Sequence, residues 1–297
     1  MAVHIWKYLL IDRINISISI GSKELYSFAL EQLYGIKELQ TNLVPHGKFK
    51  IAKYKYLTRL DYYPTEKNKI ADIEVGTTKS KHRYFRLGLY PSKFGAGEFE
   101  HFKEVLALLL PEFDYQKLYK TGRVSYIELA ADSLSHIIHS FIPFRSRCSC
   151  SFIFVDKNGK AGTTYIGSKT SNLRFCIYDK HKQLTESNAP ATYDKHTRIE
   201  ARSRHIGLMP CELLEKMSNP FEKLEIADLQ KARDASKDKI WQAFLDQCLK
   251  VGSAQALSQN PKKRKQFMKM LRASAAPWWN PQHIWEGLPK ALKAIKP

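Results

Sequence analysis

A regular alternation of apolar and polar residues is the feature that most constrains the fold of this chain. Isoleucines at positions 14, 16, 18 and 20 alternate with Asn15, Ser17 and Ser19. The same period of two recurs in residues 123–133, 173–180 and 197–204, and residues 48–90 are also rich in strand-forming side chains. Successive side chains of a strand point to opposite faces of its sheet, so each segment has one apolar and one polar face. This pattern is typical of antiparallel sheets with one face turned to water.

Helices are expected beside this sheet and in the last quarter of the chain. Residues 22–35 have helical periodicity, with Ser22 as the amino-terminal cap and Gly35 as the stop. A second helix is expected before Pro111, and the sequence from Pro220 onward is helical in character. We therefore predict an α+β fold, mainly an antiparallel sheet with flanking helices, followed by a helical C-terminal part. The predicted division is a catalytic body over residues 1–215 and a helical region over residues 216–297, which contacts DNA or docks on the body.

The charge of the chain favours a polyanionic partner. Its 297 residues include 48 lysines and arginines against 29 aspartates and glutamates, a formal net charge of +19 at pH 7. Cations that neutralise phosphates release condensed counterions, so nucleic acid is the first expectation for a partner. Ribosomal proteins and membrane-surface proteins share such an excess, and charge alone does not separate these classes.

The cysteines and the first residues indicate the compartment. The five cysteines are odd in number and lack the spacing of a structural zinc site, so we expect reduced thiols. Residues 1–20 are apolar but include Lys7, Asp12 and Arg13. They have neither the layout of a cleavable signal nor an apolar run of about 18 residues. We expect a cytoplasmic protein with no membrane span.

Three of the alternating segments have unusual polar faces. The side chains of polar parity are Tyr126, Glu128, Ala130 and Asp132 in the first, Arg174, Cys176, Tyr178 and Lys180 in the second, and Arg198, Glu200, Arg202 and Arg204 in the third. A solvated sheet face explains each strand taken alone. If the three strands are neighbours, one surface combines carboxylates, a tyrosine and several cations. Such a surface is suited to hold a divalent metal and a phosphodiester.

Tyr178 is the candidate nucleophile on this surface. A phenol with a pKa of about 10 is a poor nucleophile at neutral pH, and nearby cations favour the phenolate. Arg174, Lys180 and Lys182 are the cations close to Tyr178 in the sequence. The alternative is that Tyr178 is an ordinary half-buried strand tyrosine.

A metal ion would complete this chemistry. Held by Glu128, with Asp132 or Glu200 helping, it would neutralise the attacked phosphate and stabilise the leaving 3′ oxygen. Two carboxylates and a substrate phosphate are the ligands that Mg²⁺ prefers, and Mn²⁺ accepts the same oxygen ligands. We therefore expect Mg²⁺ or Mn²⁺ as the cofactor.

Four short motifs occur in a fixed order along the chain. They are LGLYPSKF at 87–94, YIELAAD at 126–132, a segment from YIGSKTS to IYDK at 165–180, and RIEAR at 198–202. In this order the motifs resemble the replication initiation factor family. That family includes rolling-circle plasmid initiators, related mobilisation relaxases and, more distantly, the gene II-type replication proteins of filamentous phages. The resemblance covers roughly residues 80–215.

The resemblance implies a bacterial, plasmid- or phage-encoded DNA nickase. The tyrosine that matches Tyr178 attacks one strand of the replication origin, keeps a 5′-phosphotyrosyl link and frees a 3′-OH primer. By the same match, Glu128 and Asp132 or Glu200 serve the metal. Glu128 stands where the family commonly has aspartate, and no His-hydrophobe-His motif is present. The implied partners are origin DNA, a host helicase and polymerase, and a second copy in a homodimer.

Further cations are candidates for DNA contact. They are Lys169, Arg174, Arg198, Arg202, Lys262, Lys263, Arg264 and Lys265. Lys169 is also explained as a solvated turn residue, and the run 262–265 as a solvated face or an import signal. Trp278, Trp279 and Trp285 either stack on bases or dock the tail onto the body.

Two classes of function fit these observations. The first is a metal-dependent nicking and strand-transfer enzyme that initiates rolling-circle replication, or a mobilisation relaxase with the same chemistry. The second is a catalytically silent DNA-binding protein in which Tyr178 only packs. Carboxylates of the same parity as Tyr178 favour the enzyme, because docking on phosphates needs no carboxylates that face DNA.

Overall fold

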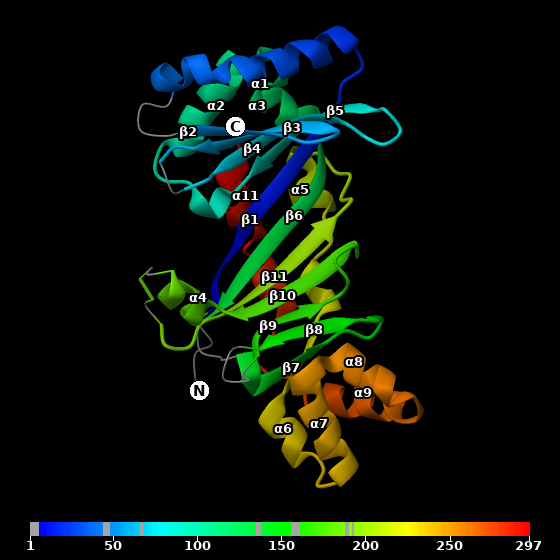
Figure 1. The fold of residues 1–297 in the computed structure, drawn as a ribbon. Helices are drawn as coiled ribbons and strands as arrows, with labels where there is room; N and C mark the ends of the chain where they lie inside the picture. Colours follow the sequence, from blue (N-terminus) through cyan, green and yellow to red (C-terminus); the bar gives the residue numbers. More distant parts are fainter. Residues whose placement is uncertain are drawn as a thin grey trace. The chain divides into compact units, whose positions relative to one another are not determined.

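The computed structural model describes residues 6–43, 48–65, 68–134, 138–155, 161–187, 190–191 and 193–297 (Figure 1). Ten of the described strands form one sheet in the order β2-β3-β4-β5-β1-β6-β11-β10-β9-β8, and β12 pairs with β7 in a second sheet. The antiparallel sheet with helices beside it confirms the predicted α+β class. The chain divides into two compact units. Unit 1 contains residues 1–9, 129–203 and 218–288, and unit 2 contains residues 10–128, 204–217 and 289–297.

Unit 2 contains most of β1 and the start of β6. Its strands are β1 (Trp6–Ser19), β2 (Lys48–Lys53), β3 (Leu57–Tyr63), β4 (Ala71–Thr77), β5 (Arg83–Leu89) and β6 (Arg123–Ser133), of which β1 and β6 also have residues in unit 1. Its helices are α1 (Lys23–Leu43), α2 (Glu98–Leu109), α3 (Tyr115–Thr121) and α5 (Leu213–Lys216), with α11 (Leu288–Leu292) at its border. Short 3₁₀ turns are η1 (Pro91–Lys93), η2 (Pro111–Phe113), η4 (Pro210–Glu212) and η7 (Lys293–Ile295).

Helices α1, α2 and α3 lie beside the strands β2 to β5 in unit 2 (Figure 1). The ring of Tyr62 on β3 lies 5.2 Å from that of Phe102 on α2, and the ring of Phe85 on β5 stacks at 4.4 Å on that of Phe113. Helix α1 begins as predicted, since the amide of Leu25 donates to the Ser22 hydroxyl at 2.9 Å. The predicted stop at Gly35 is wrong, because α1 runs on to Leu43. A glycine inside a helix costs only about 1 kcal/mol, which packing of the neighbouring turns can offset.

Unit 1 contains the remaining strands and most of the C-terminal helices. Its strands are β7 (Phe141–Phe144), β8 (Ser151–Val155), β9 (Ala161–Ile166), β10 (Leu173–Asp179), β11 (Thr197–Arg204) and β12 (Glu225–Asp228), with the end of β6. Its helices are α4 (Lys180–Glu186), α6 (Leu229–Asp234), α7 (Lys239–Val251), α8 (Ser253–Gln259), α9 (Arg264–Ala273) and α10 (Pro281–Trp285). Its 3₁₀ turns are η3 (Ile138–Ser140), η5 (Pro220–Lys223) and η6 (Pro261–Lys263).

The C-terminal helices of unit 1 surround an aromatic core. Trp241, Phe244 and Phe267 are buried there together with Ile142 and Phe144 of β7. The region from Pro220 is mainly helical, as predicted, but it also contains a strand that was not predicted. Residues 225–228 form β12, which pairs with β7. The ring of Trp278 packs edge-on against Phe141 of β7 at 5.2 Å, so this tryptophan packs inside unit 1. The predicted division into a body over residues 1–215 and a C-terminal region over residues 216–297 stays a prediction. In the structure, residues 218–288 belong to the same compact unit as residues 129–203.

Two further expectations concern the compartment. The five cysteines lie in the described part of the chain, and none of them forms a disulfide there. Among the helices that the structure describes, none is both long and apolar enough to cross a membrane.

Candidate functional site

Strands β10 and β11 bring two of the predicted polar faces together in unit 1. Strand β10 pairs with β11 so that Tyr178 lies opposite Arg198 and Cys176 lies opposite Glu200. Strand β6 is the other neighbour of β11 in the sheet. Directly opposed residues of an antiparallel pair share a face. The condition set by the sequence, that these strands are neighbours, is therefore met.

Tyr178 is hydrogen-bonded to a buried carboxylate. Its hydroxyl donates to Glu200 Oε1 at 2.8 Å. The other oxygen of Glu200, Oε2, accepts from Arg202 Nε at 3.1 Å and Nη2 at 2.7 Å. Glu200 is only 2% exposed, whereas Tyr178 is half-buried. The arginine orients the carboxylate, and the carboxylate orients the phenol.

A second buried ion pair lies beside this one. Arg198 donates to Asp132 from Nε at 2.6 Å and from Nη2 at 2.9 Å, and both side chains are buried. His196 Nε2 lies 3.4 Å from Asp132 Oδ2. Burial opposes ionisation of Asp132, but the hydrogen bonds from Arg198 and the nearby His196 outweigh it and lower the pKa of Asp132. Sequence reasoning missed His196, although it has the same parity as Arg198 and Glu200.

The two predicted catalytic lysines lie on a helix and not on the strand. Strand β10 ends at Asp179, whose carboxylate accepts from the amide of Lys182 at 2.9 Å and caps α4. The prediction that Lys180 continues the face of Tyr178 along the strand is therefore wrong. Lys180 Nζ still lies 5.9 Å from the centre of the Tyr178 ring, while Lys182 Nζ pairs with Glu186 at 3.9 Å. Lys180 is thus near the phenol, and Lys182 is directed along the helix.

Arg174 stacks on an aromatic ring of the same face. Its guanidinium lies 3.8 Å from the centre of the Tyr165 ring. Arg174 also lies directly opposite Arg202. Like charges in this position repel, and the carboxylate of Glu200 that pairs with Arg202 offsets part of this repulsion. Cys176, next to Tyr165 on the face, is buried; burial and the charge of Glu200 raise the pKa of its thiol to about 12.

The other predicted DNA-binding cations are more dispersed. Lys169 is exposed in the turn from β9 to β10, where Gly167 adopts a φ of +99° and the amide of Ser168 donates to Ser171 Oγ at 3.0 Å. Lys262 and Lys265 are exposed, and Lys263 and Arg264 are half-buried, where η6 leads into α9. Their contact with DNA stays a prediction.

The predicted metal ligands have partners within the chain. Both oxygens of Asp132 and both oxygens of Glu200 accept from arginines or from Tyr178. Glu128 belongs to unit 2, where the Tyr126 hydroxyl donates to it. Over the residues that the structure describes, no group of three or more His, Cys, Asp or Glu side chains is arranged to hold a metal ion. The guanidinium groups stand at oxygens that a cation would use, so this arrangement does not fit Mg²⁺, and the cofactor stays a prediction.

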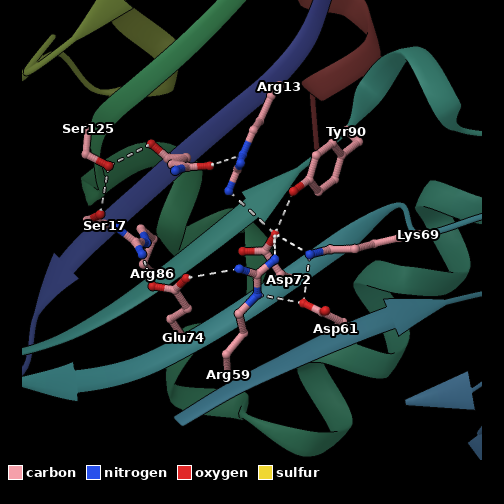
Figure 2. Close-up of polar contacts among 11 residues, drawn as sticks. Arg13, Ser17, Arg59, Asp61, Lys69, Asp72, Glu74, Arg86, Tyr90 and Ser125 are labelled. Carbon is pink, nitrogen blue, oxygen red and sulfur yellow. Dashed lines mark hydrogen bonds and ion pairs between the residues drawn. The ribbon is translucent and has the colours of Figure 1, made fainter. Parts of the chain in front are cut away.

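A polar cluster in unit 2 was not foreseen (Figure 2). Four donors surround Asp72 Oδ2, namely Lys69 Nζ at 3.0 Å, Tyr90 Oη at 3.0 Å, Arg59 Nη2 at 3.4 Å and Arg13 Nη2 at 3.7 Å. Asp72 lies opposite Gly88 on β5, and Glu74 beside it pairs with Arg86. Burial opposes ionisation of Asp72, but Lys69, Arg13 and Arg59 outweigh it and lower its pKa.

Comparisons with known proteins leave the family open. No sequence profile of a known protein family matches the chain. No curated protein matches it either. Among solved structures, the chain is similar to a rolling circle replication initiator protein from Geobacillus stearothermophilus. That similarity has a TM-score of 0.39 and 9% sequence identity, and it covers 83% of this chain and 98% of the other. The function proposed below therefore rests on the geometry of unit 1.

Proposed function

We propose that this chain is a DNA-nicking enzyme that initiates rolling-circle replication by transferring one DNA strand to Tyr178. The observation that carries the proposal is the chain of contacts from the Tyr178 hydroxyl to Glu200 and from Glu200 to Arg202. A tyrosine that only packs in a sheet needs no buried carboxylate held in place by an arginine. A nucleophilic tyrosine needs a positioned acceptor for its proton and nearby cations for the phosphate.

The reaction follows from these contacts. The Tyr178 oxygen attacks the phosphorus of one phosphodiester while its proton passes to Glu200 Oε1. The bond between the phosphorus and the 3′ oxygen breaks, and that oxygen takes a proton from solvent. The products are a 5′-phosphotyrosyl link and a free 3′-OH, so bonds and protons balance.

Cations on the same face would bind the attacked phosphate. Arg174 and Arg202 lie opposite each other next to the Cys176–Glu200 pair, and Lys180 lies near the phenol. Charge-assisted bonds from arginine are strong and directional, which suits a phosphate during displacement. No step above depends on a divalent ion.

The test detects the covalent product. Purified protein is incubated with a pool of single-stranded DNA of random sequence, with Mn²⁺ and with chelator, and denatured in detergent. Protein-linked DNA is then captured and sequenced. We expect an adduct on Tyr178 in the wild-type protein and none in Tyr178→Phe, with DNA binding retained.

Two matched variants separate the alternatives. Tyr165→Phe changes a tyrosine on the same face that is not bonded to Glu200, and Tyr193→Phe changes an exposed tyrosine of the same unit. Both should still form the adduct. An adduct that survives Tyr178→Phe and is lost in Tyr193→Phe would assign the nucleophile to Tyr193. DNA binding without any adduct would favour the non-catalytic DNA-binding protein.

A further inference from the structure

Two phenylalanines on the edge strand β8 lie on the same face of unit 1 as Tyr178. The register runs from Tyr178 to Thr163 on β9 and from Thr163 to Phe154 on β8. A second row runs from Cys176 to Tyr165 and from Tyr165 to Phe152. Because opposed residues share a face, both phenylalanines lie on the face of the nucleophile. Adjacent strands are about 4.8 Å apart, which puts the backbone of Phe154 about 10 Å from that of Tyr178.

These phenylalanines are unusually exposed. Phe154 is 61% exposed and Phe152 is 49% exposed, whereas Thr164, Ile166, Phe175 and Ile177, of the opposite parity on β9 and β10, are buried. Single exposed apolar residues are ordinary on protein surfaces. Here two aromatic rings alternate along one strand, and the ring of Phe154 packs edge-on against Tyr165 at 5.7 Å. Tyr165 in turn supports the guanidinium of Arg174. The result is a continuous set of flat groups, which we call the aromatic platform: Phe152, Phe154, Tyr165 and Arg174.

We propose that the aromatic platform stacks the bases of single-stranded DNA next to the phosphate attacked by Tyr178. The inference rests on the proposed function and deepens it by assigning the surface that binds the bases of the unpaired DNA strand. Bases stack on aromatic rings and on arginine planes irrespective of sequence. A strand whose phosphate reaches a nucleophile on a sheet face has unstacked bases, and the platform replaces part of their lost stacking. The arginines of the face complement the phosphates of that strand.

The competing occupant is a second copy of the chain. Exposed apolar side chains on an edge strand also favour pairing between copies. The cations of the same face argue for DNA, because Arg174 lies within the platform and opposite Arg202. An interface between two identical copies would bury the charge of Arg174 in both copies without supplying an anion to pair with it.

The test compares DNA with and without bases. Tyr178→Phe protein is used so that binding is measured without cleavage, and binding is followed by fluorescence anisotropy. The probes are a short mixed-sequence oligonucleotide and an abasic phosphodiester chain of the same length. The test variant adds Phe152→Leu and Phe154→Leu, and the control adds Phe28→Leu, an exposed phenylalanine on α1. Circular dichroism checks that each variant is folded.

The expected result is a loss confined to DNA that carries bases. The platform variant should bind the oligonucleotide at least about tenfold more weakly and the abasic chain unchanged, since two stacks are weakened and each contributes about fivefold or more. Equal losses on both probes, or no loss, would overturn the proposal. Sedimentation that shows a dimer only with the phenylalanines present, with unchanged DNA binding, would assign the face to a second copy. Binding here does not depend on nicking, so failure of the platform and failure of the covalent adduct are separate outcomes.

Discussion

The hydrogen bond between Tyr178 and Glu200 can be tested by a double-mutant cycle in stability. Tyr178→Phe removes the hydroxyl, and Glu200→Gln removes the charge while it keeps the shape. A hydrogen bond to a charged group contributes about 1.5–3 kcal/mol. The carboxylate is 2% exposed but the tyrosine is half-buried, so we expect a coupling of about 1.5 kcal/mol, at the low end of that range. Glu200→Gln alone should cost about 2–3 kcal/mol, because Arg202 also loses its partner and is partly able to rehydrate.

The assay is urea denaturation of the four proteins at pH 7, followed by circular dichroism. The coupling energy is the difference between the double variant and the sum of the two single variants. As a control, Tyr34→Phe, which removes a hydroxyl bonded to Thr58 in unit 2, should add to Glu200→Gln within about 0.5 kcal/mol. Additive effects of Tyr178→Phe and Glu200→Gln would show that the bond is not made in solution. The proton acceptor assigned to Tyr178 would then be wrong.

Two further predictions concern the buried charges. The pKa of Asp132 is lowered by Arg198 and His196 against the effect of burial, so its carboxylate stabilises the fold above its unfolded pKa of about 3.9. The difference in unfolding free energy between wild type and Asp132→Asn should be constant from pH 8 to about pH 5 and shrink below about pH 4; a difference that already falls between pH 7 and pH 6 would contradict this assignment. In unit 2, a Cβ on Gly88 would lie 2.6 Å from Asp72 Oδ1, so Gly88→Ala should destabilise by about 1–3 kcal/mol. The control is Gly162→Ala, whose Cβ would lie 3.6 Å from its nearest atom. It should change the unfolding free energy by less than about 0.5 kcal/mol in the same denaturation assay. Equal costs at both glycines would contradict the packing of Asp72 against Gly88.

Parity along the strands could be predicted from the sequence, whereas the pairing of charges could not. Alternation places Tyr178 and Glu200 on polar faces, and the structure puts both on one face of neighbouring strands. Arg198 and Arg202 are equally close to Glu200 in sequence. The strand β6 lies beside β11, and its Asp132 pairs with Arg198. Arg202 is therefore the arginine that pairs with Glu200. That adjacency is a property of the whole sheet.

Local signals explain two of the errors. Asp179 before Lys180 is a good helix cap, and this signal predicts that α4 begins there. In residues 151–155 apolar side chains occupy both parities, so periodicity did not reveal that Phe152 and Phe154 are exposed. The cluster around Asp72 involves residues of β1, β3, β4 and β5, together with Lys69 and Tyr90. It becomes visible only once the order of those strands is known.

The two units have a similar strand order but different polar faces. In unit 2 the strand β1 lies beside β5, the last strand of the series β2 to β5, and β6 lies in the same way beside β11, the last strand of the series β8 to β11. The polar faces of both units contain carboxylate–arginine pairs. In unit 2, however, the Tyr90 hydroxyl donates to Asp72, and burial together with the charge of that carboxylate raises the pKa of Tyr90. Such a phenol stays protonated and is a poor nucleophile. In unit 1, Glu200 accepts from both Tyr178 and Arg202, and the ring of Tyr178 lies near Lys180. Our proposal assigns strand transfer to this tyrosine.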